Sequence, residues 1–149
     1  MNQRESKSAI RKLLKDYGLR YSRPRASILS FFREADHHIS AEDLHLTLKR
    51  RGERLSLSTV YLNLSVLTEA GLIRQLNGLT GEALYDSNVK PHYHLICKET
   101  GEVVDVPLPM IDGVPLPRFL KECIQEATGW QIDEPSLELR GLSPKVAKE

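Results

Sequence analysis

Apolar residues recur every three or four positions through most of the first half of the chain, and this spacing predicts amphipathic helices. The expected helices cover residues 4–17, 22–33, 40–51 and 58–70. Ser22, Ser40 and Ser58 stand where an N-cap hydroxyl would accept the first unpaired backbone N–H groups. In the fourth helix we expect Asn63 and Leu62 on faces turned away from the core.

A β-hairpin is predicted directly after the fourth helix. Apolar and polar residues alternate over 72–76, a turn rich in Asn and Gly covers 77–81, and a return strand covers 82–86. Helices followed by a hairpin are typical of a winged-helix module, in which one helix enters the major groove of DNA. A structural helix bundle with a packed hairpin, or a winged helix that binds protein, stays open on this pattern alone.

The second half reads as a short mixed segment. Strands are predicted over 92–98 and 102–107, a proline-rich connector over 107–117, a helix over 116–127 and one or two strands within 130–142. The fold class is therefore α+β, with an N-terminal winged-helix DNA-binding domain over residues 1–86 and a small α/β dimerisation and metal-sensing domain over 87–149. Because so short a segment buries little core alone, we expect a homodimer.

Charge is distributed unevenly between the two halves. The chain of 149 residues has a net charge of +1, yet residues 1–76 hold 14 Lys or Arg against 8 Asp or Glu, and residues 77–149 hold 7 against 12. A basic first half favours a polyanion such as DNA as its partner, although solvated surface charge alone could give the same split. The polar start and the two cysteines predict a protein of the reducing cytoplasm without a membrane span.

Histidines and aspartates form a candidate metal site. His92 and His94 are two residues apart in a predicted strand, so their imidazoles share a face. Asp86, Asp105 and His38 extend the set to three nitrogens and two carboxylates, without a thiolate. These donors suit Fe(II) or Mn(II) better than structural zinc. Spacing alone leaves open that the histidines are ordinary loop residues and the aspartates turn formers.

A long ordered pattern then resembles one known family. The segments that carry it are HISAEDL (38–44), STVYLNLSVLTEAGLI (58–73), LYDSN (84–88), HYHLIC (92–97), TGEVVDV (100–106) and the TGWQI…LELRGL ending. They resemble the ferric uptake regulator family over nearly the whole chain, and within it the peroxide-stress regulators. The resemblance implies a metal-dependent repressor that binds palindromic operators as a homodimer, with His38, Asp86, His92, His94 and Asp105 as metal ligands.

The sequence departs from this family at two places. Many members hold zinc with four cysteines in two CxxC pairs, but here the first pair reads Cys97 and Thr100, and the second falls on Ser143 and Val146. We therefore expect no four-cysteine structural zinc. Leu62 stands where the family's recognition helix often has Arg, which removes a possible guanine contact.

The expected mechanism is a metal clamp between the two lobes that releases DNA when the metal is lost. The resemblance points to His38 or His92 as the residue oxidised by peroxide when Fe(II) is bound. Oxidation of Cys97 or Cys123 is a rival route, but apolar surroundings predict that both thiols are buried. An iron or manganese uptake regulator without peroxide sensing remains an alternative. An enzyme is disfavoured because the five ligands would occupy most coordination positions and no nucleophile or substrate-binding motif is evident nearby.

Residues for DNA contact come from the first half. Candidate phosphate contacts are Arg4, Lys7, Arg11, Arg20, Arg23, Arg25, Arg50, Arg51 and Arg54, of which Arg20 and Arg25 are preferred. Candidate base readers at the start of the fourth helix are Ser58, Thr59, Tyr61 and Asn63.

Overall fold

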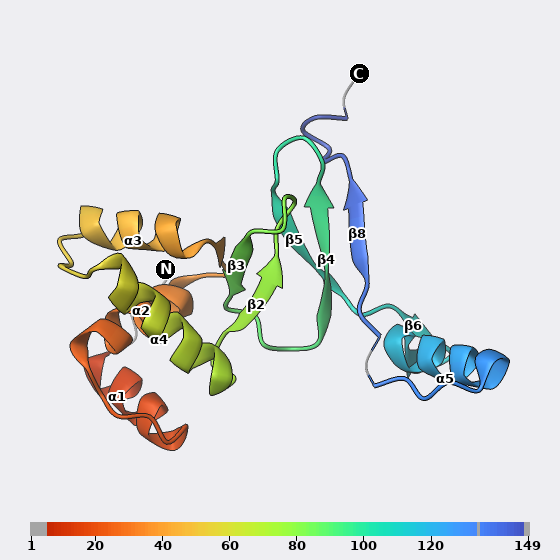
Figure 1. The fold of residues 1–149 in the computed structure, drawn as a ribbon, viewed down its shortest axis with the longest axis horizontal. Coiled ribbons are helices and arrows are strands. Elements are labelled where there is room, and N and C mark those ends of the chain that lie inside the picture. The colour runs from red at the N-terminus through yellow and green to blue at the C-terminus, as the bar shows by residue number, and fades with distance from the viewer. Residues whose placement is uncertain (1–5, 134, 148–149) are drawn as a thin grey trace. The chain divides into compact units, whose positions relative to one another are not determined.

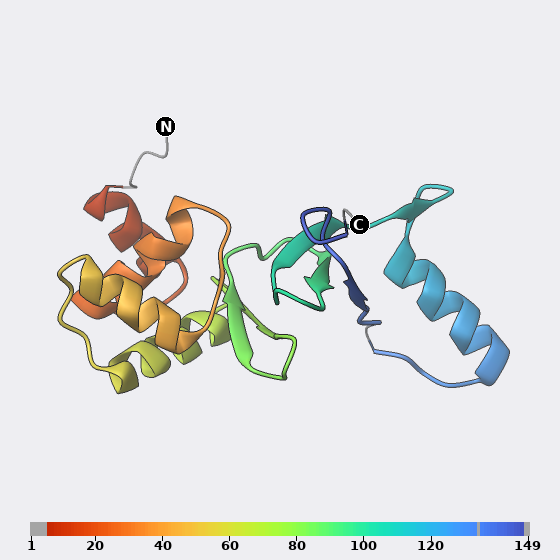
Figure 2. The ribbon, with the colours of Figure 1, turned by 90° about the horizontal axis from the view of Figure 1, so that it is seen from above.

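The computed structural model describes residues 6–133 and 135–147. Backbone contacts divide the chain into two units, Met1–Val89 and Lys90–Glu149. Figure 1 and Figure 2 show the helices and the first strands in red to green, and the later strands and the last helix in green to blue. The division follows shortly after residue 86, where the sequence pattern places the end of the first domain; the functional roles of the two domains stay predictions.

Helices make up most of the first unit. They are α1 (Lys7–Asp16), α2 (Arg23–Glu34), α3 (Ala41–Arg50) and α4 (Leu57–Glu69). The Ser22 and Ser40 hydroxyls accept backbone N–H groups three residues further on, at 3.3 and 3.1 Å, which confirms both as N-caps. The predicted helices are present, and the expected start of the first at Arg4 lies outside the described residues.

The start of α4 differs from the prediction in one respect. Ser56, not Ser58, is its N-cap: the Ser56 backbone is extended and its Oγ accepts the Thr59 N–H at 3.2 Å. The sequence could not separate the two serines, because both precede the buried apolar residues of the helix. Leu57, the first residue of α4, is exposed and so does not extend the apolar periodicity back to Ser56. Asn63 also corrects the prediction, because it is buried, at 3% exposure, rather than on an outer face.

The core of the first unit lies between these helices. Each helix contributes a side chain that is fully shielded from solvent, namely Leu14, Ile28, Leu44 and Leu64. Burial of one such side chain stabilises the fold by roughly 1.5–3 kcal/mol. Because α4 packs against both α2 and α3, only its outer stripe remains open to a partner.

A small antiparallel sheet completes the first unit. It consists of β1 (His38–Ile39), β2 (Arg74–Asn77) and β3 (Ala83–Asp86), paired in the order β1-β3-β2. The hairpin of β2 and β3 confirms the predicted wing. Strand β1 was not predicted, because a two-residue strand has no period to detect; it places His38 directly opposite Asp86. Helices followed by this wing form the winged-helix arrangement.

The second unit contains a sheet and a helix. Strands β4 (His92–Cys97) and β5 (Val103–Pro107) pair antiparallel, as predicted, and β8 (Glu138–Gly141) pairs parallel to β4. The sheet order is β5-β4-β8. The last strand is thus confirmed within 130–142, and the fold class is α+β.

The proline-rich connector is more ordered than its composition suggests. It contains the short hairpin β6 (Met110–Ile111) and β7 (Val114–Pro115), whose turn residues Asp112 and Gly113 both have positive φ. An Asp-Gly pair with this backbone is the turn that a two-residue hairpin requires. Helix α5 (Leu116–Thr128) follows, and Gly129, at φ 72°, ends it. Across residues 6–133 and 135–147, every helix is too short or too polar to cross a bilayer.

The cap of α4 gives a stability prediction. Ser56→Ala should lower the free energy of unfolding by about 1 kcal/mol, because the Thr59 N–H loses its acceptor. Ser58→Ala, at the residue the sequence favoured, should change it by less than about 0.5 kcal/mol. Urea unfolding followed by circular dichroism measures both, and the reverse ranking would show that Ser58 is the working cap.

Candidate functional site

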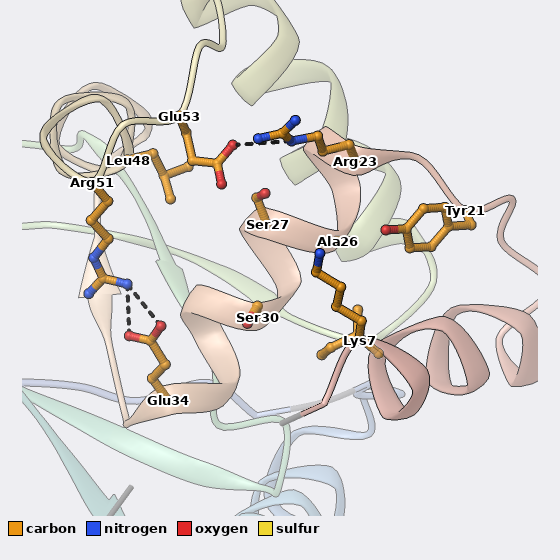
Figure 3. A pocket seen from close by; sticks show the side chains of 11 residues that line it. Lys7, Tyr21, Arg23, Ala26, Ser27, Ser30, Glu34, Leu48, Arg51 and Glu53 are labelled. Carbon is orange, nitrogen blue, oxygen red and sulfur yellow. Dashed lines mark hydrogen bonds and ion pairs between the residues drawn. The ribbon is translucent and has the colours of Figure 1, made fainter. Parts of the chain in front are cut away.

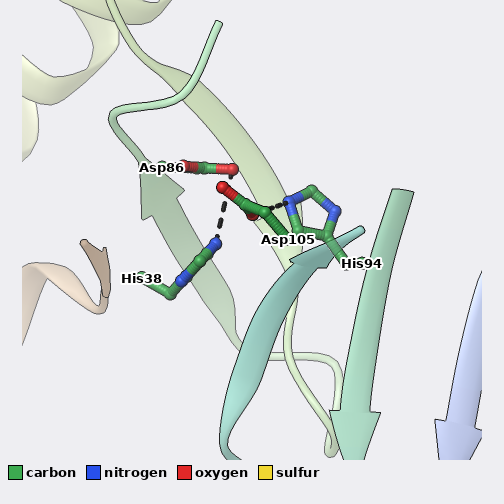
Figure 4. Close-up of side chains that lie close together, drawn as sticks. All are labelled: His38, Asp86, His94 and Asp105. Atoms are coloured by element: carbon green, nitrogen blue, oxygen red, sulfur yellow. Dashed lines mark ion pairs between the residues drawn. The ribbon is translucent and has the colours of Figure 1, made fainter. Parts of the chain in front are cut away.

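Two of the predicted metal ligands meet on the wing of the first unit. His38 on β1 lies opposite Asp86 on β3, with His38 Nε2 3.5 Å from Asp86 Oδ2 (Figure 4). We call these residues the wing pair. Their side chains face each other because directly opposed residues of an antiparallel pair share one face of the sheet.

The Asp86 carboxylate is fully buried. Its Oδ1 accepts the backbone N–H of Asn88 at 2.8 Å, and its Oδ2 faces the imidazole. A buried carboxylate is costly unless hydrogen bonds or a cation compensate its charge. The wing pair therefore offers one oxygen and one nitrogen donor in surroundings that favour a bound cation.

The other three predicted ligands meet in the second unit. His92 and His94 on β4 and Asp105 on β5 form what we call the β4–β5 cluster. Asp105 Oδ1 lies 3.2 Å from His92 Nε2 and 3.4 Å from His94 Nε2, and the two imidazole nitrogens are 2.9 Å apart. Figure 4 shows the contact between His94 and Asp105, which are paired directly across the strands.

The spacing within the β4–β5 cluster fits donors to one metal ion. Neighbouring ligands held about 2.1 Å from an ion at right angles are about 3 Å apart, close to the separations found here. The carbonyl of Lys90 faces His92 Nδ1 within hydrogen-bonding distance, and a carbonyl can only accept. This contact favours the tautomer with the proton on Nδ1, which presents the Nε2 lone pair to the cluster.

The donor set matches the chemistry predicted from the sequence. Two imidazoles and one carboxylate in the β4–β5 cluster are the donors of a two-histidine, one-carboxylate iron site, which leaves coordination positions open. The wing pair adds one imidazole and one carboxylate. Nitrogen and oxygen donors without thiolate suit Fe(II) or Mn(II), so these residues fit the ion that the sequence predicts.

The outer stripe of α4 carries the exposed candidates for reading DNA. Ser58, Tyr61, Leu62 and Ser65 are exposed and recur at helical spacing along this helix. Thr59 is half-buried, and its Oγ1 lies 2.9 Å from Ser56 Oγ. Leu62 is 62% exposed. An apolar side chain therefore lies on the stripe at the position where the family's recognition helix often has Arg.

Asn63 acts inside the protein rather than on its surface. Its Nδ2 donates to the Thr59 carbonyl at 2.9 Å, and its Oδ1 accepts from Arg25 Nε at 3.1 Å. Arg25 also donates through Nη1 to the Arg20 carbonyl at 2.7 Å. The buried amide thus ties α4 to the chain that leads into α2. Periodicity could not detect this, because the partner guanidinium is far away in sequence.

Several predicted phosphate contacts already have protein partners. In the pocket of about 500 Å³ drawn in Figure 3, Arg51 Nη1 lies 2.9 Å from Glu34 Oε1, and Arg23 Nε lies 3.9 Å from Glu53 Oε2. The Arg11 guanidinium stacks 4.0 Å over the Tyr21 ring. These pairings leave less positive charge for phosphate than the sequence count suggests. Arg4 lies outside the described residues.

One partner of the α4 stripe was not identified from the sequence. The Tyr61 hydroxyl donates to Glu42 Oε1 in the first turn of α3. This hydrogen bond lowers the pKa of the Glu42 carboxyl and raises the pKa of the Tyr61 hydroxyl. The sequence pattern could not predict this hydrogen bond, because Tyr61 and Glu42 lie 19 positions apart on different helices.

The cysteines differ from each other. Cys97 at the end of β4 is buried, whereas Cys123 on α5 is exposed, so the prediction of two buried thiols is wrong for Cys123. The Thr100 hydroxyl and the backbone N–H groups of Ser143, Thr100 and Glu99 donate to the Cys97 sulfur and lower the pKa of its thiol to about 6. Positions 97, 100 and 143 are three of the four at which the resemblance places zinc-binding cysteines.

A winged helix joined in one chain to histidine and aspartate clusters defines a class, the metal-dependent transcriptional regulators. Comparison with known proteins agrees. The ferric uptake regulator family profile matches residues 16–140, so the chain belongs to that family. Regulators of this family act as dimers on DNA, and the relatives are transcriptional regulators rather than enzymes.

Named relatives include both peroxide and iron regulators. The chain is 30% identical over 145 residues to the peroxide operon regulator of Bacillus subtilis, covering 97% of this chain and 95% of that protein. It is 32% identical over 131 residues to the ferric uptake regulation protein of Neisseria gonorrhoeae, covering 87% of each. The structure of the Pseudomonas aeruginosa ferric uptake regulator with manganese matches with a TM-score of 0.66 and 30% identity, covering 89% of this chain and 96% of that one.

The environment of Cys97 predicts a pH dependence. Because its pKa falls from 9.0 to about 6 on folding, the unfolded chain binds more protons between these values, and stability rises with pH there. The contribution is complete above about pH 9 and is lost as the pH falls through about 6. Urea midpoints over this range should show a rise in the wild type that Cys97→Ser lacks.

Cys123→Ser is the matched control, because the structure places that thiol on the exposed surface of α5. It should keep the same rise in midpoint as the wild type. A Cys97→Ser profile parallel to that of the wild type would contradict the assignment of the thiolate.

Proposed function

We propose that this chain is a peroxide-sensing repressor that binds palindromic operator DNA as a homodimer and releases it after metal-catalysed oxidation of a ligand histidine. The observation that carries the proposal is the β4–β5 cluster, where two imidazoles and a carboxylate converge without a thiolate. An operator-binding regulator acts where the genome is, and we place this one in the cytoplasm.

Fe(II) or Mn(II) is the proposed regulatory ion. Both ions accept mixed nitrogen and oxygen donors in five- or six-coordinate geometry. The related Pseudomonas aeruginosa regulator has been solved with manganese, which supports the same ion here. The proposed ligands are His38, Asp86, His92, His94 and Asp105.

The two ligand groups are proposed to share one ion. The wing pair supplies two donors and the β4–β5 cluster three, so neither alone satisfies the five or six positions that Fe(II) or Mn(II) prefers. An ion that takes donors from both units favours the arrangement in which they converge. It can shift that equilibrium only by its differential affinity for the two states.

The peroxide step is proposed to end on His38 or His92. Fe(II) held by the proposed ligands would supply the redox chemistry that cleaves the peroxide O–O bond, and the imidazole carbon would be the net reductant, so that the ion ends as Fe(II). One oxygen of hydrogen peroxide is then inserted into an imidazole C–H bond, and the other leaves as water. The oxidised ring binds the ion less well, so the shared site opens and DNA is released.

An iron or manganese uptake regulator that ignores peroxide is the second candidate. The identity to the Neisseria gonorrhoeae protein, which is named a ferric uptake regulation protein, specifically favours it. The two candidates share the fold, the ion and DNA binding, and differ only in the response of the ligand histidines to peroxide.

Exposed apolar surface in the second unit supports the homodimer. None of the α5 residues, all of which are described, is buried, although Phe119 and Ile124 mark an apolar face. Trp130, Leu137 and Leu139 are exposed as well. Burial of such surface against a second copy would stabilise a unit of this small size.

Peroxide sensing is tested on protein loaded anaerobically with Fe(II) or Mn(II). A DNA duplex is first selected from a random pool with the Mn(II)-loaded protein. This duplex should bind to both the Fe(II)-loaded and the Mn(II)-loaded protein. A peroxide pulse should release only the Fe(II) form, with one added oxygen on the His38 or His92 peptide by mass spectrometry. His45 is an internal control, because its imidazole is hydrogen-bonded to the Leu55 carbonyl and is not a proposed ligand. It should therefore stay unmodified.

Each outcome separates the candidates. Retained DNA and unmodified ligands would identify a plain metal regulator. Release with oxygen on Cys97 or Cys123 alone would assign sensing to a thiol. His38→Ala should weaken metal binding at least about tenfold, since loss of even an outer partner of a ligand costs that much; unchanged affinity would show that the β4–β5 cluster holds its ion without the wing pair.

Salt dependence tests the DNA-facing residues. Arg20→Ala should weaken operator and unrelated duplex alike and lower the slope of log affinity against log salt by about 0.9 for each lost phosphate contact. Arg20 is preferred to Arg25 for this test, because Arg25→Ala would also unpair the buried Asn63. The exposed Arg118 of α5 is the matched control, and Arg118→Ala should leave the slope unchanged.

A further inference from the structure

The stripe of α4 has a carboxylate beside it that the proposed function does not use. Tyr61 is 42% exposed, and its hydroxyl donates to Glu42 on the neighbouring helix α3. In Figure 1 these helices belong to the same winged-helix unit, and they pack against each other. Glu42 thus places a carboxylate in direct contact with a candidate base reader.

The direction of this hydrogen bond is fixed by charge. The bond lowers the pKa of the Glu42 carboxyl, so this group is ionised at neutral pH and can only accept. The pKa of the Tyr61 hydroxyl is raised, chiefly by the same bond, so the hydroxyl keeps its proton. The only hydroxyl proton of Tyr61 is therefore committed to the protein.

This commitment limits what Tyr61 can contact on DNA. With its proton engaged, the hydroxyl offers only lone pairs. Phosphate oxygens are acceptors and cannot pair with it, whereas the exocyclic amines of adenine N6 and cytosine N4 are donors on the major-groove edge. The negative charge of Glu42 also disfavours a phosphate close to this end of the stripe.

We propose that Glu42 is a specificity-determining residue that positions the Tyr61 hydroxyl to accept from the exocyclic amine of adenine or cytosine in the major groove. The inference rests on the proposed function, since it requires that α4 faces DNA. It gives Glu42 an indirect role: the carboxylate touches Tyr61, and Tyr61 touches the base.

The experiment starts from a random duplex pool selected with Mn(II)-loaded wild-type protein. Each adenine or cytosine of the enriched half-site is then replaced, one at a time, by the purine lacking N6 or the pyrimidinone lacking N4. One such replacement should weaken wild-type binding about fivefold, as expected for one lost hydrogen bond. The two analogues distinguish adenine from cytosine as the base read.

Variants at both ends of the hydrogen bond follow. Glu42→Ala and Tyr61→Phe should each bind the amine-bearing and amine-free duplexes equally well. Glu42→Ala should also bind unrelated duplex about threefold more tightly, because the freed hydroxyl can donate to a phosphate and a negative charge is lost. The double variant should bind the two duplexes with the same ratio as Tyr61→Phe alone, since both changes act through one hydroxyl.

Glu69→Ala is the matched control. Glu69 is exposed at the far end of α4, so its removal changes the net charge by the same amount without touching Tyr61. This variant should keep the wild-type preference for the amine. Urea midpoints of all variants show that the fold is intact, and Tyr61→Phe tests the same bond if Glu42→Ala does not fold.

Three results overturn the inference. They are full amine discrimination by Glu42→Ala, loss of discrimination by Glu69→Ala as well, and a wild type indifferent to every replacement. Failure of the wild type to enrich any duplex is a different outcome: it refutes the proposed function, and the role of Glu42 falls with it.

Discussion

Strand register is the constraint on which the candidate metal ligands depend. Antiparallel pairing places His38 opposite Asp86 and His94 opposite Asp105. A slip of one residue in either pair would turn one ligand to the opposite face of its sheet. Apolar neighbours prevent that slip. Tyr85, next to Asp86, is buried in the helical core, and Ile39, next to His38, packs against it.

The same logic holds in the second unit. Tyr93 stands between His92 and His94 in β4 and is 5% exposed, so burial of its ring on one face of the sheet keeps both imidazoles on the other. The candidate ligands are therefore positioned by the buried side chains next to them in each strand. The free energy that fixes them comes from hydrophobic burial of the intervening side chains.

A short stretch of the first unit connects the wing pair to α4, the helix proposed to face DNA. His38 lies in β1, Ser40 caps α3, and Glu42 in the first turn of α3 holds the Tyr61 hydroxyl. A candidate ligand and the contact of a candidate base reader are thus separated by only three residues of ordered backbone. In the proposed function, a shift of β1 on ion binding would displace the start of α3, which gives a physical route between ion and helix within one unit.

Periodicity and capping residues were enough to predict the elements with a repeating pattern. The helices, the wing hairpin and the β4–β5 pair follow from spacing of 3.6 or 2 residues. Strand β1 and the β6–β7 hairpin escaped because two-residue strands have no period. The role of Asn63 and the contact of Glu42 escaped because hydrogen bonds between distant residues leave no local pattern. The five candidate metal ligands could be proposed from the sequence because donor chemistry, unlike packing, is visible in residue types, and their role stays a prediction.

The surroundings of Cys97 show how the second unit accommodates its departure from the family pattern. Its sulfur accepts hydrogen bonds from the Thr100 hydroxyl and the Ser143 N–H. These bonds connect the turn after β4 to the chain after β8. Hydrogen bonds to a thiolate do not supply the binding free energy that a structural zinc ion adds to folding. The apolar faces of α5 and β8 are exposed, so the proposed burial against a second copy would add stability to the unit. In the proposed homodimer, folding of this unit would be coupled to association, and the stability of the second unit should depend on protein concentration more strongly than that of the winged helix.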